Sequence, residues 1–202
     1  MNMKWIIATN NKSKVKEFHK ILPPLGIEAQ SLAEAGICLE VEETGTSFEE
    51  NALLKARACC ARTGLPSVSD DSGLAVDALD GAPGIYSARY ACSDAACNAR
   101  VLQEMENVPD GEARHARFIC VIACVLPDGR EFTVRGECHG QIAREERGEN
   151  GFGYDPLFYA PEYGKTYGEL APELKNEISH RAAALRAFAE KLKEMGIGQD
   201  DK

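Results

Sequence analysis

The chain has 202 residues, of which 44% are hydrophobic and 27% are charged, a composition typical of a globular protein with a sizeable core. Its formal net charge of −9 argues against nucleic-acid polymers and anionic membranes as partners, because an acidic surface repels phosphate groups. The net charge does not exclude the binding of one small anion in a local basic pocket. No apolar stretch approaches the roughly 20 residues that span a bilayer, and the start lacks a signal-peptide pattern. We therefore expect one cytoplasmic domain, residues 1–202, without a separable linker.

The eight cysteines include no C-x-x-C pair, which argues against a zinc site. Several lie inside apolar runs such as "FICVIACVL", where cysteine behaves as a small hydrophobic residue. Reduced, buried thiols are therefore expected in place of disulfides.

The first half of the chain predicts strands that alternate with helices. Residues 5–8 indicate a strand, and a polar turn leads into a helix that Pro23-Pro24 ends. A second strand is expected at 27–32, followed by an acidic loop. The next helix begins at a capping box that starts with Ser47 and ends at Gly64. The apolar stripe of the first helix consists of Val15, Phe18, Ile21 and Leu22.

The second half adds a hairpin and two more helices. "LPSVS" predicts a short strand that stops at Asp70-Asp71, and residues 94–105 predict a helix. Residues 116–142 are typical of a hairpin around a Pro-Asp-Gly turn, and 181–195 of a closing helix. The sequence therefore predicts an α/β fold, a mixed sheet flanked by helices.

The turn "ATNNKSK", residues 8–14, is a candidate phosphate site. A turn from strand to helix exposes backbone N–H groups at the positive end of the helix dipole, which favours an anion. Without the glycines of a Walker A loop, it could also be a plain helix cap followed by solvated lysines. The candidate ligands are Thr9, Asn10, Asn11, Lys12, Ser13 and Lys14.

Acidic residues occur in two separate stretches. Glu40, Glu42 and Glu43 lie in one loop, and Asp70 and Asp71 are adjacent. The loop could be merely solvated, and the aspartates could form an Asp/Ser/Gly turn. A divalent cation explains both, because neighbouring carboxylates repel each other unless paired or metal-bound, and hard oxygen ligands suit Mg²⁺.

Two further stretches offer groups that could recognise a base. Glycines surround Phe152 and Tyr154 in "GENGFGYDPLF", which predicts aromatic rings on a tight loop where a planar base could stack. A glycine-rich surface loop with aromatic plugs would look the same. Lys175, His180 and Arg181 precede the closing helix and could donate hydrogen bonds or lie on the surface.

Together these parts are those of a metal-dependent nucleotide hydrolase. The chain resembles the inosine/xanthosine triphosphate pyrophosphatases (XTP/dITP diphosphatases) of the bacterial type. The resemblance covers residue 4 to about 193, and seven ordered motifs carry it: TNNKSK (9–14), ETG (43–45), SFEENA (47–52), DDSGL (70–74), GAPGIYSARY (81–90), GFGYDP (151–156) and SHR (179–181).

The resemblance implies an elongated two-lobed α/β fold with a central substrate cleft, usually a homodimer. It implies Mg²⁺-dependent hydrolysis of ITP, dITP and XTP to the monophosphate and pyrophosphate. Asp71 would accept a proton from the attacking water and contact the metal, with Glu42 or its neighbour Glu43 as the second metal ligand. The implied substrate-binding residues are the 9–14 loop, Ser72, Phe152, Gly153, Tyr154, Asp155, Lys175, His180 and Arg181.

Two other readings compete with this enzyme. A nucleotide-sensing module without turnover would gain nothing from Asp70-Asp71, and a Mg²⁺ phosphatase of another phosphate ester would have no ring for Phe152 to stack on.

Overall fold

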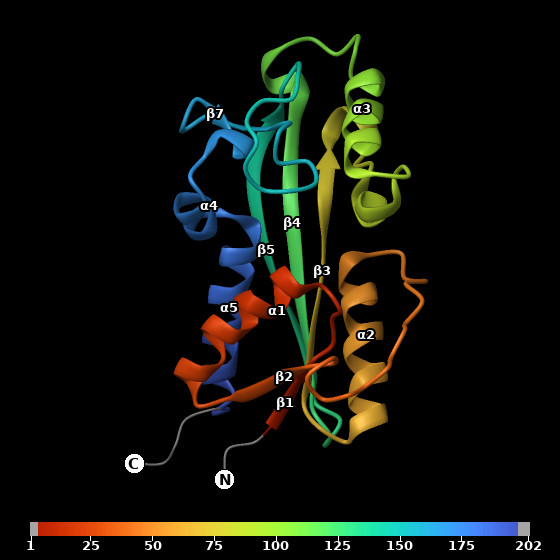
Figure 1. Ribbon diagram of the computed structural model, residues 1–202, viewed down its shortest axis with the longest axis vertical. Coiled ribbons are helices and arrows are strands. Elements are labelled where there is room, and N and C mark those ends of the chain that lie inside the picture. Colours follow the sequence, from red (N-terminus) through yellow and green to blue (C-terminus); the bar gives the residue numbers. More distant parts are fainter. Residues whose placement is uncertain (1–3, 198–202) are drawn as a thin grey trace. The chain divides into compact units, whose positions relative to one another are not determined.

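The computed structural model describes residues 4–197, excluding the side chain of Ser13, as a mixed sheet with helices on its faces (Figure 1). Seven strands follow the order β2-β1-β3-β4-β5-β6-β7. The elements are β1 (Lys4–Ile7), α1 (Lys12–Ile21), β2 (Glu28–Ser31), α2 (Phe48–Thr63), β3 (Ser67–Val76), α3 (Asp94–Glu104), β4 (His115–Val125), β5 (Glu131–Ile142), β6 (Phe158–Ala160), β7 (Lys165–Thr166), α4 (Pro172–Ile178) and α5 (His180–Glu194). No helix among residues 4–197 is long and apolar enough to cross a membrane.

The chain divides into two compact units. Unit 1 comprises residues 1–71, 120–136 and 183–202, and unit 2 comprises residues 72–119 and 137–182. The chain passes between the units within β3, β4, β5 and α5. The division therefore falls inside regular elements.

Unit 1 places α1 and α2 on opposite faces of the sheet. β1 pairs in parallel with β2 and with β3, so the connecting helices cross in opposite directions along the sheet. Side chains alternate between the faces of a strand: Ile7 packs with Phe18 of α1, whereas Ile6 packs with Cys59 of α2. Figure 1 shows the sheet of unit 1 between these two helices.

Unit 2 has its own core around the antiparallel strands β5, β6 and β7. Phe118 of β4 lies 4.4 Å from Phe158 of β6 between ring centroids, and Val101 of α3 is fully buried in the same cluster. This core supports the loop after β5, which carries the aromatic candidates.

The structure confirms the expected α/β fold and most predicted elements. Ser47 accepts a hydrogen bond from the backbone of Glu50 and caps α2, as expected, while the Glu50 carboxylate bonds Thr46 in place of Ser47. The prediction that a short strand stops at Asp70-Asp71 is wrong, because β3 continues through both acids to Val76. The Asp/Ser/Gly turn is therefore absent, and the acids lie inside a buried strand.

Arg114 connects several chain ends in unit 2. Its buried guanidinium donates to the carbonyls of Ile142, Ala143, Met105 and Val108 at 2.7–3.2 Å. A buried carbonyl without a donor costs free energy comparable to a lost hydrogen bond. This side chain therefore replaces backbone pairing that the ends of β5 and α3 lack.

Replacing this donor tests its structural role. Arg114→Met should lower the free energy of unfolding by about 3 kcal/mol, because buried acceptors lose their partners. Urea denaturation measures the change. The matched control is Arg144→Met, whose exposed guanidinium bonds Asp110 and nearby carbonyls, with an expected loss below about 1 kcal/mol. Equal losses in both variants would contradict the assignment.

Candidate active site

A pocket of about 360 Å³ in unit 1 brings the predicted phosphate loop and the acidic loop together. We call it the β1–α1 pocket. It is lined by Ala8, Thr9, Asn10, Asn11, Lys14, Leu32, Leu39, Glu40, Val41, Glu43 and Lys55. Four of the six residues predicted from the 9–14 turn thus face one pocket. Lys12 is exposed and does not line it, and the side chain of Ser13 lies outside the described part of the structure.

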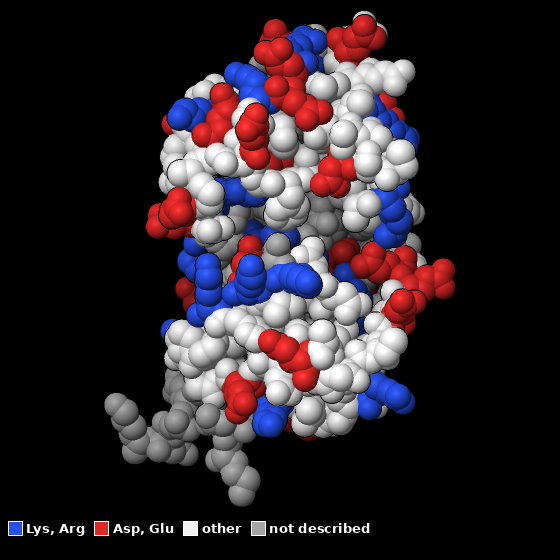
Figure 2. Space-filling model, viewed as in Figure 1, with Lys and Arg blue, Asp and Glu red and all other residues white. Residues whose placement is uncertain are grey.

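The β1–α1 turn is organised by its own polar side chains. Thr9 Oγ1 accepts from the backbone N–H of Asn11 at 3.2 Å, and Asn11 Oδ1 accepts from that of Lys14 at 3.3 Å. The first turn of α1 carries no acid, although acids would complement the helix dipole there. Lys and Arg side chains gather over α1 on the face drawn in Figure 2. This concentration of positive charge suits an anionic ligand.

The two adjacent aspartates point to opposite faces of β3, since side chains alternate along a strand. Asp70 lies on the face of α1, where Lys14 Nζ is 2.7 Å from its Oδ2. Asp71 lies on the face of α2, where Lys55 Nζ is 3.2 Å from its Oδ1. Each carboxylate thus has its own lysine, and the mutual repulsion expected for two neighbouring acids is reduced.

Lys55 joins the acidic loop to Asp71. Its Nζ is also 2.6 Å from Glu43 Oε1, so it lies within salt-bridge distance of two carboxylates. Burial alone would lower the pKa of Lys55, but Asp71, Glu43 and Asp70 outweigh burial and raise it. Sequence analysis did not select this residue as functional. Its spacing in α2, three positions after the buried Ala52 and four before the buried Cys59, places it on the buried side of the helix and was the available signal.

The environment of Asp71 fits a cation. Burial raises the pKa of its carboxyl and Glu43 adds to this, while Lys55 and Lys14 oppose it. Its Oδ2 is buried and makes no hydrogen bond within the described residues. Carboxylate oxygens with a spare buried acceptor are what Mg²⁺ prefers in proteins. No group of three or more His, Cys, Asp or Glu arranged for a metal occurs in residues 4–197, so phosphate or water would have to supply further ligands.

The structure distinguishes the two neighbouring glutamates of the acidic loop. Glu43 is partly buried, lines the β1–α1 pocket and reaches Lys55. Glu42 is exposed and is not among the residues that line the pocket. The geometry therefore favours Glu43, the alternative to the first choice from sequence.

In unit 2 only one of the two predicted loop aromatics is exposed. Phe152 is 53% exposed and could offer its ring to a ligand. The expectation that Tyr154 also lies on the loop surface is wrong, because it is buried in the unit 2 core and its hydroxyl donates to the Ser87 carbonyl at 2.8 Å. Tyr154 therefore anchors the loop.

The remaining candidates surround Phe152. Asp155 is buried and accepts from the Phe152 backbone N–H at 2.8 Å and from Lys175. The Lys175 ammonium lies 4.9 Å from the centroid of the Phe152 ring and the Arg181 guanidinium 5.9 Å. Arg181 also donates to Ser72 Oγ at 3.3 Å. An aromatic ring beside two cations is suited to an electron-rich, partly anionic ligand.

His180 and Arg181 are buried, so the alternative of ordinary surface residues is wrong for them. The His180 ring stacks on Phe118 with centroids 4.8 Å apart and an interplanar angle of 17°. Gly153 has a φ of +60°, which favours glycine. Hydrogen bonds and ring contacts connect five of the candidates in unit 2: Ser72, Phe152, Asp155, Lys175 and Arg181. Gly153 and His180 are their neighbours in the chain.

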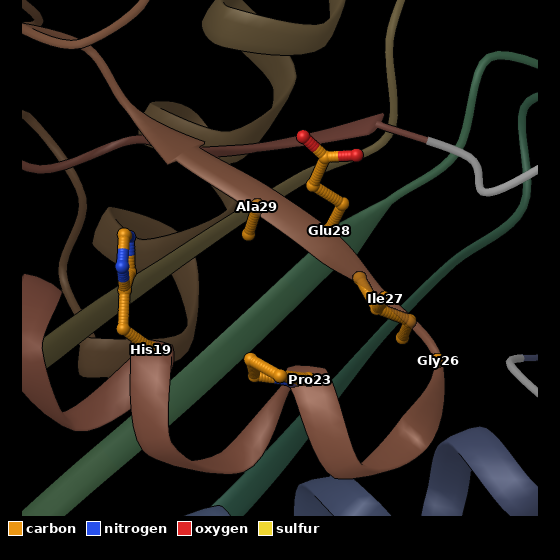
Figure 3. A pocket seen from close by; sticks show the side chains of 6 residues that line it. All are labelled: His19, Pro23, Gly26, Ile27, Glu28 and Ala29. Atoms are coloured by element: carbon orange, nitrogen blue, oxygen red, sulfur yellow. The ribbon is translucent and has the colours of Figure 1, made fainter.

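A second pocket in unit 1, of about 380 Å³, lies beside the edge strand β2 (Figure 3). It is lined by His19, Pro23, Gly26, Ile27, Glu28 and Ala29, none of which is a predicted site residue. It lacks the lysines and paired acids of the β1–α1 pocket.

Comparisons with known proteins give a consistent result. Residues 5–191 match the Ham1 family. A protein of Desulforamulus reducens named dITP/XTP pyrophosphatase is 51% identical over 98% of this chain and 100% of its own length, and one of Geobacillus kaustophilus with the same name is 49% identical over 96% of each chain. The solved structure of the Staphylococcus aureus Ham1 protein superposes with a TM-score of 0.88 at 41% identity, covering 95% of this chain and 99% of that one.

The raised pKa of Asp71 predicts a stability change on neutralisation. The folded protein binds a proton at Asp71 more tightly than the unfolded chain does, so the ionised form lowers the free energy of unfolding above the folded-state pKa. This loss disappears as pH falls toward about 4, the ordinary pKa of aspartate. Asp71→Asn should therefore raise the free energy of unfolding near neutral pH, with a gain that shrinks on acidification.

Urea denaturation in the presence of a chelator, repeated across pH, measures this effect. Glu42→Gln is the control, because that side chain is exposed. Destabilisation by Asp71→Asn at neutral pH would show that the salt bridge with Lys55 outweighs the cost of burial.

Proposed function

The chain belongs to the Ham1 family, and on this premise we propose that it hydrolyses the deaminated purine nucleoside triphosphates ITP, dITP and XTP to the monophosphate and pyrophosphate. One observation carries the proposal: the cationic 9–14 loop and Glu43 line a single pocket, and Lys55 links that pocket to Asp71. The proposed hydrolysis removes deaminated purines from the nucleotide pool.

In unit 1 the triphosphate is held by the 9–14 loop, with Lys55 as an added cation. Asp71 accepts the proton of a water that attacks phosphorus; the α–β anhydride bond breaks and pyrophosphate leaves with its electron pair. Asp71, with Glu43 or Glu42, would hold Mg²⁺, which supplies charge stabilisation for the leaving pyrophosphate. Lys55 opposes the effect of burial on Asp71, so it makes the pKa of the proton-accepting carboxyl lower than burial alone would.

In unit 2 the base is recognised by stacking on Phe152 and by donors from His180 and Arg181. Hypoxanthine and xanthine present a 6-oxo acceptor, whereas adenine presents an amino group there. A buried donor left unpaired opposite adenine costs orders of magnitude in rate, which gives selectivity against ATP. Asp155, which is paired with Lys175, holds the backbone of Phe152 in place.

The proposal extends to assembly and location. A homodimer is inferred from the resemblance to the family, and a cytoplasmic location from the nucleotide-pool function proposed here. The two units act as one domain in this proposal.

Turnover assays test the activity directly. With Mg²⁺ and ITP or XTP, the protein should release pyrophosphate as its first phosphate product, and ATP should be hydrolysed far more slowly. A panel of ITP, dITP, XTP, GTP and ATP, with separate detection of pyrophosphate and orthophosphate, measures this. Orthophosphate as the first product would indicate a phosphatase, and ITP binding without turnover a sensing module.

The role of Asp71 is tested by Asp71→Asn. Loss of the proton acceptor should lower kcat by about 10²–10⁴-fold while ITP binding is largely kept. Calorimetric titration of ITP provides the binding control. Unchanged kcat would contradict the assignment.

Glu42→Gln and Glu43→Gln form a matched pair for the metal. The geometry predicts that Glu43→Gln raises the Mg²⁺ concentration needed for half-maximal rate by about tenfold, in the range for loss of a metal-site residue, and that Glu42→Gln leaves it within about twofold. Mg²⁺ titrations of initial rate measure both. The reverse order would assign the metal to Glu42.

A further inference from the structure

The loop that carries Phe152 is fastened to α3 through both polar groups of one residue, Gly153. Asn98 Nδ2 donates to the Gly153 carbonyl at 3.2 Å, and the Gly153 N–H donates to Asp94 Oδ2 at 3.1 Å. We infer that Asn98 and Asp94 are positioning residues that hold Phe152 ready to stack on the base. This inference rests on the proposed function, in which Phe152 contacts the base.

The backbone sets the position of Phe152, because half of its side chain is free of packing. The residue is 53% exposed, so the contacts of its ring, which include Lys175 and Arg181 at 4.9 Å and 5.9 Å from the centroid, leave half of its surface free. Its N–H donates to Asp155 Oδ2 at 2.8 Å, which fixes the loop from within. A Cβ at Gly151 would lie 2.1 Å from the same oxygen, so the loop closes tightly around Asp155. The bonds from α3 fix the other side of Phe152.

The chemistry of Asn98 fits this role better than a packing role. The residue is 3% exposed, and its Oδ1 makes no hydrogen bond within residues 4–197. Burying an amide is costly unless hydrogen bonds compensate, so a residue that only filled space there would be apolar. Asn98 and Asp94 are four residues apart and therefore lie on the same face of α3. From one face of the helix, Asp94 thus binds the peptide unit before Gly153 and Asn98 binds the peptide unit after it.

A loop ordered before the substrate arrives loses less conformational entropy on binding. Phe152 contacts the base, whereas the bond that breaks lies between phosphates. The positioning pair should therefore affect how tightly a nucleotide binds and leave the chemical step unchanged. The affinity of a ligand that has phosphates and no base should not change in these variants.

Two variants test the pair by different routes. Asn98→Leu keeps similar volume and removes the donor, and Asp94→Ala removes the acceptor at an exposed position, where folding is not at risk. Asp94→Asn keeps an acceptor oxygen and should rescue. Gln103→Ala, exposed on α3, is the matched control. Each variant is assayed with ITP for kcat and KM, and inorganic tripolyphosphate is used as a competitive inhibitor.

Both Asn98→Leu and Asp94→Ala should raise KM for ITP by about tenfold with kcat within about twofold, the pattern of lost uniform binding. Inhibition by tripolyphosphate should not change. Amide hydrogen exchange at Phe152 and Gly153 should be faster in both variants and normal in Asp94→Asn and Gln103→Ala.

Three results would overturn the inference: a fall in kcat at constant KM, equal weakening of ITP and tripolyphosphate, or faster exchange with unchanged ITP affinity. Should the unaltered protein fail to hydrolyse ITP, the proposed function is wrong. Calorimetric titration of ITP and the exchange measurement then still decide whether the α3 bonds position Phe152.

Discussion

The candidate phosphate and metal region depends on one electrostatic constraint, the burial of two adjacent carboxylates within β3. Strand geometry places Asp70 and Asp71 on opposite faces, so each needs a separate cation. Lys14 of α1 provides one and Lys55 of α2 provides the other. The two helices that cover the sheet of unit 1 are thus tied to the same dipeptide, and the pocket between the 9–14 turn and the acidic loop is built around those ties.

The same arrangement explains why the pKa shifts favour the charged form of Lys55 but disfavour the charged form of Asp71, although the two form one salt bridge. Lys55 has several carboxylates around it, and its pKa rises in spite of burial. Asp71 has Lys55 close by but also has Glu43 near, and burial raises its pKa. The ionised carboxylate of Asp71 is therefore destabilised by its surroundings, and a second cation would stabilise it. A group that is suboptimal without its ligand is common at functional sites, where stability is lost in exchange for binding or catalysis.

Hydrophobic periodicity, together with the Pro-Asp-Gly turn and the capping motif at Ser47, was sufficient to predict the α/β class, the hairpin of β4 and β5, and the capped start of α2. It failed at Asp70-Asp71, because polar residues in a buried strand look like a turn until their tertiary partners are known. It also failed at Tyr154, whose hydroxyl bonds the distant Ser87, and it did not identify Asp71 as the partner of Lys55. In each case the deciding partner lies at least sixteen positions away, and local patterns carry no information about such contacts. The choice of Glu43 over Glu42 likewise required the position of Lys55.

The continuity of β3 has an evolutionary consequence for this part of the chain. Inserting or deleting one residue before Asp70 would reverse which face every later side chain of the strand points to. Asp70 would then face α2 and Asp71 would face α1, and the apolar side chains that follow them in the strand would also change faces. Because each aspartate must face its own lysine, the length of this strand cannot drift, so its spacing should be among the most slowly changing properties of the molecule.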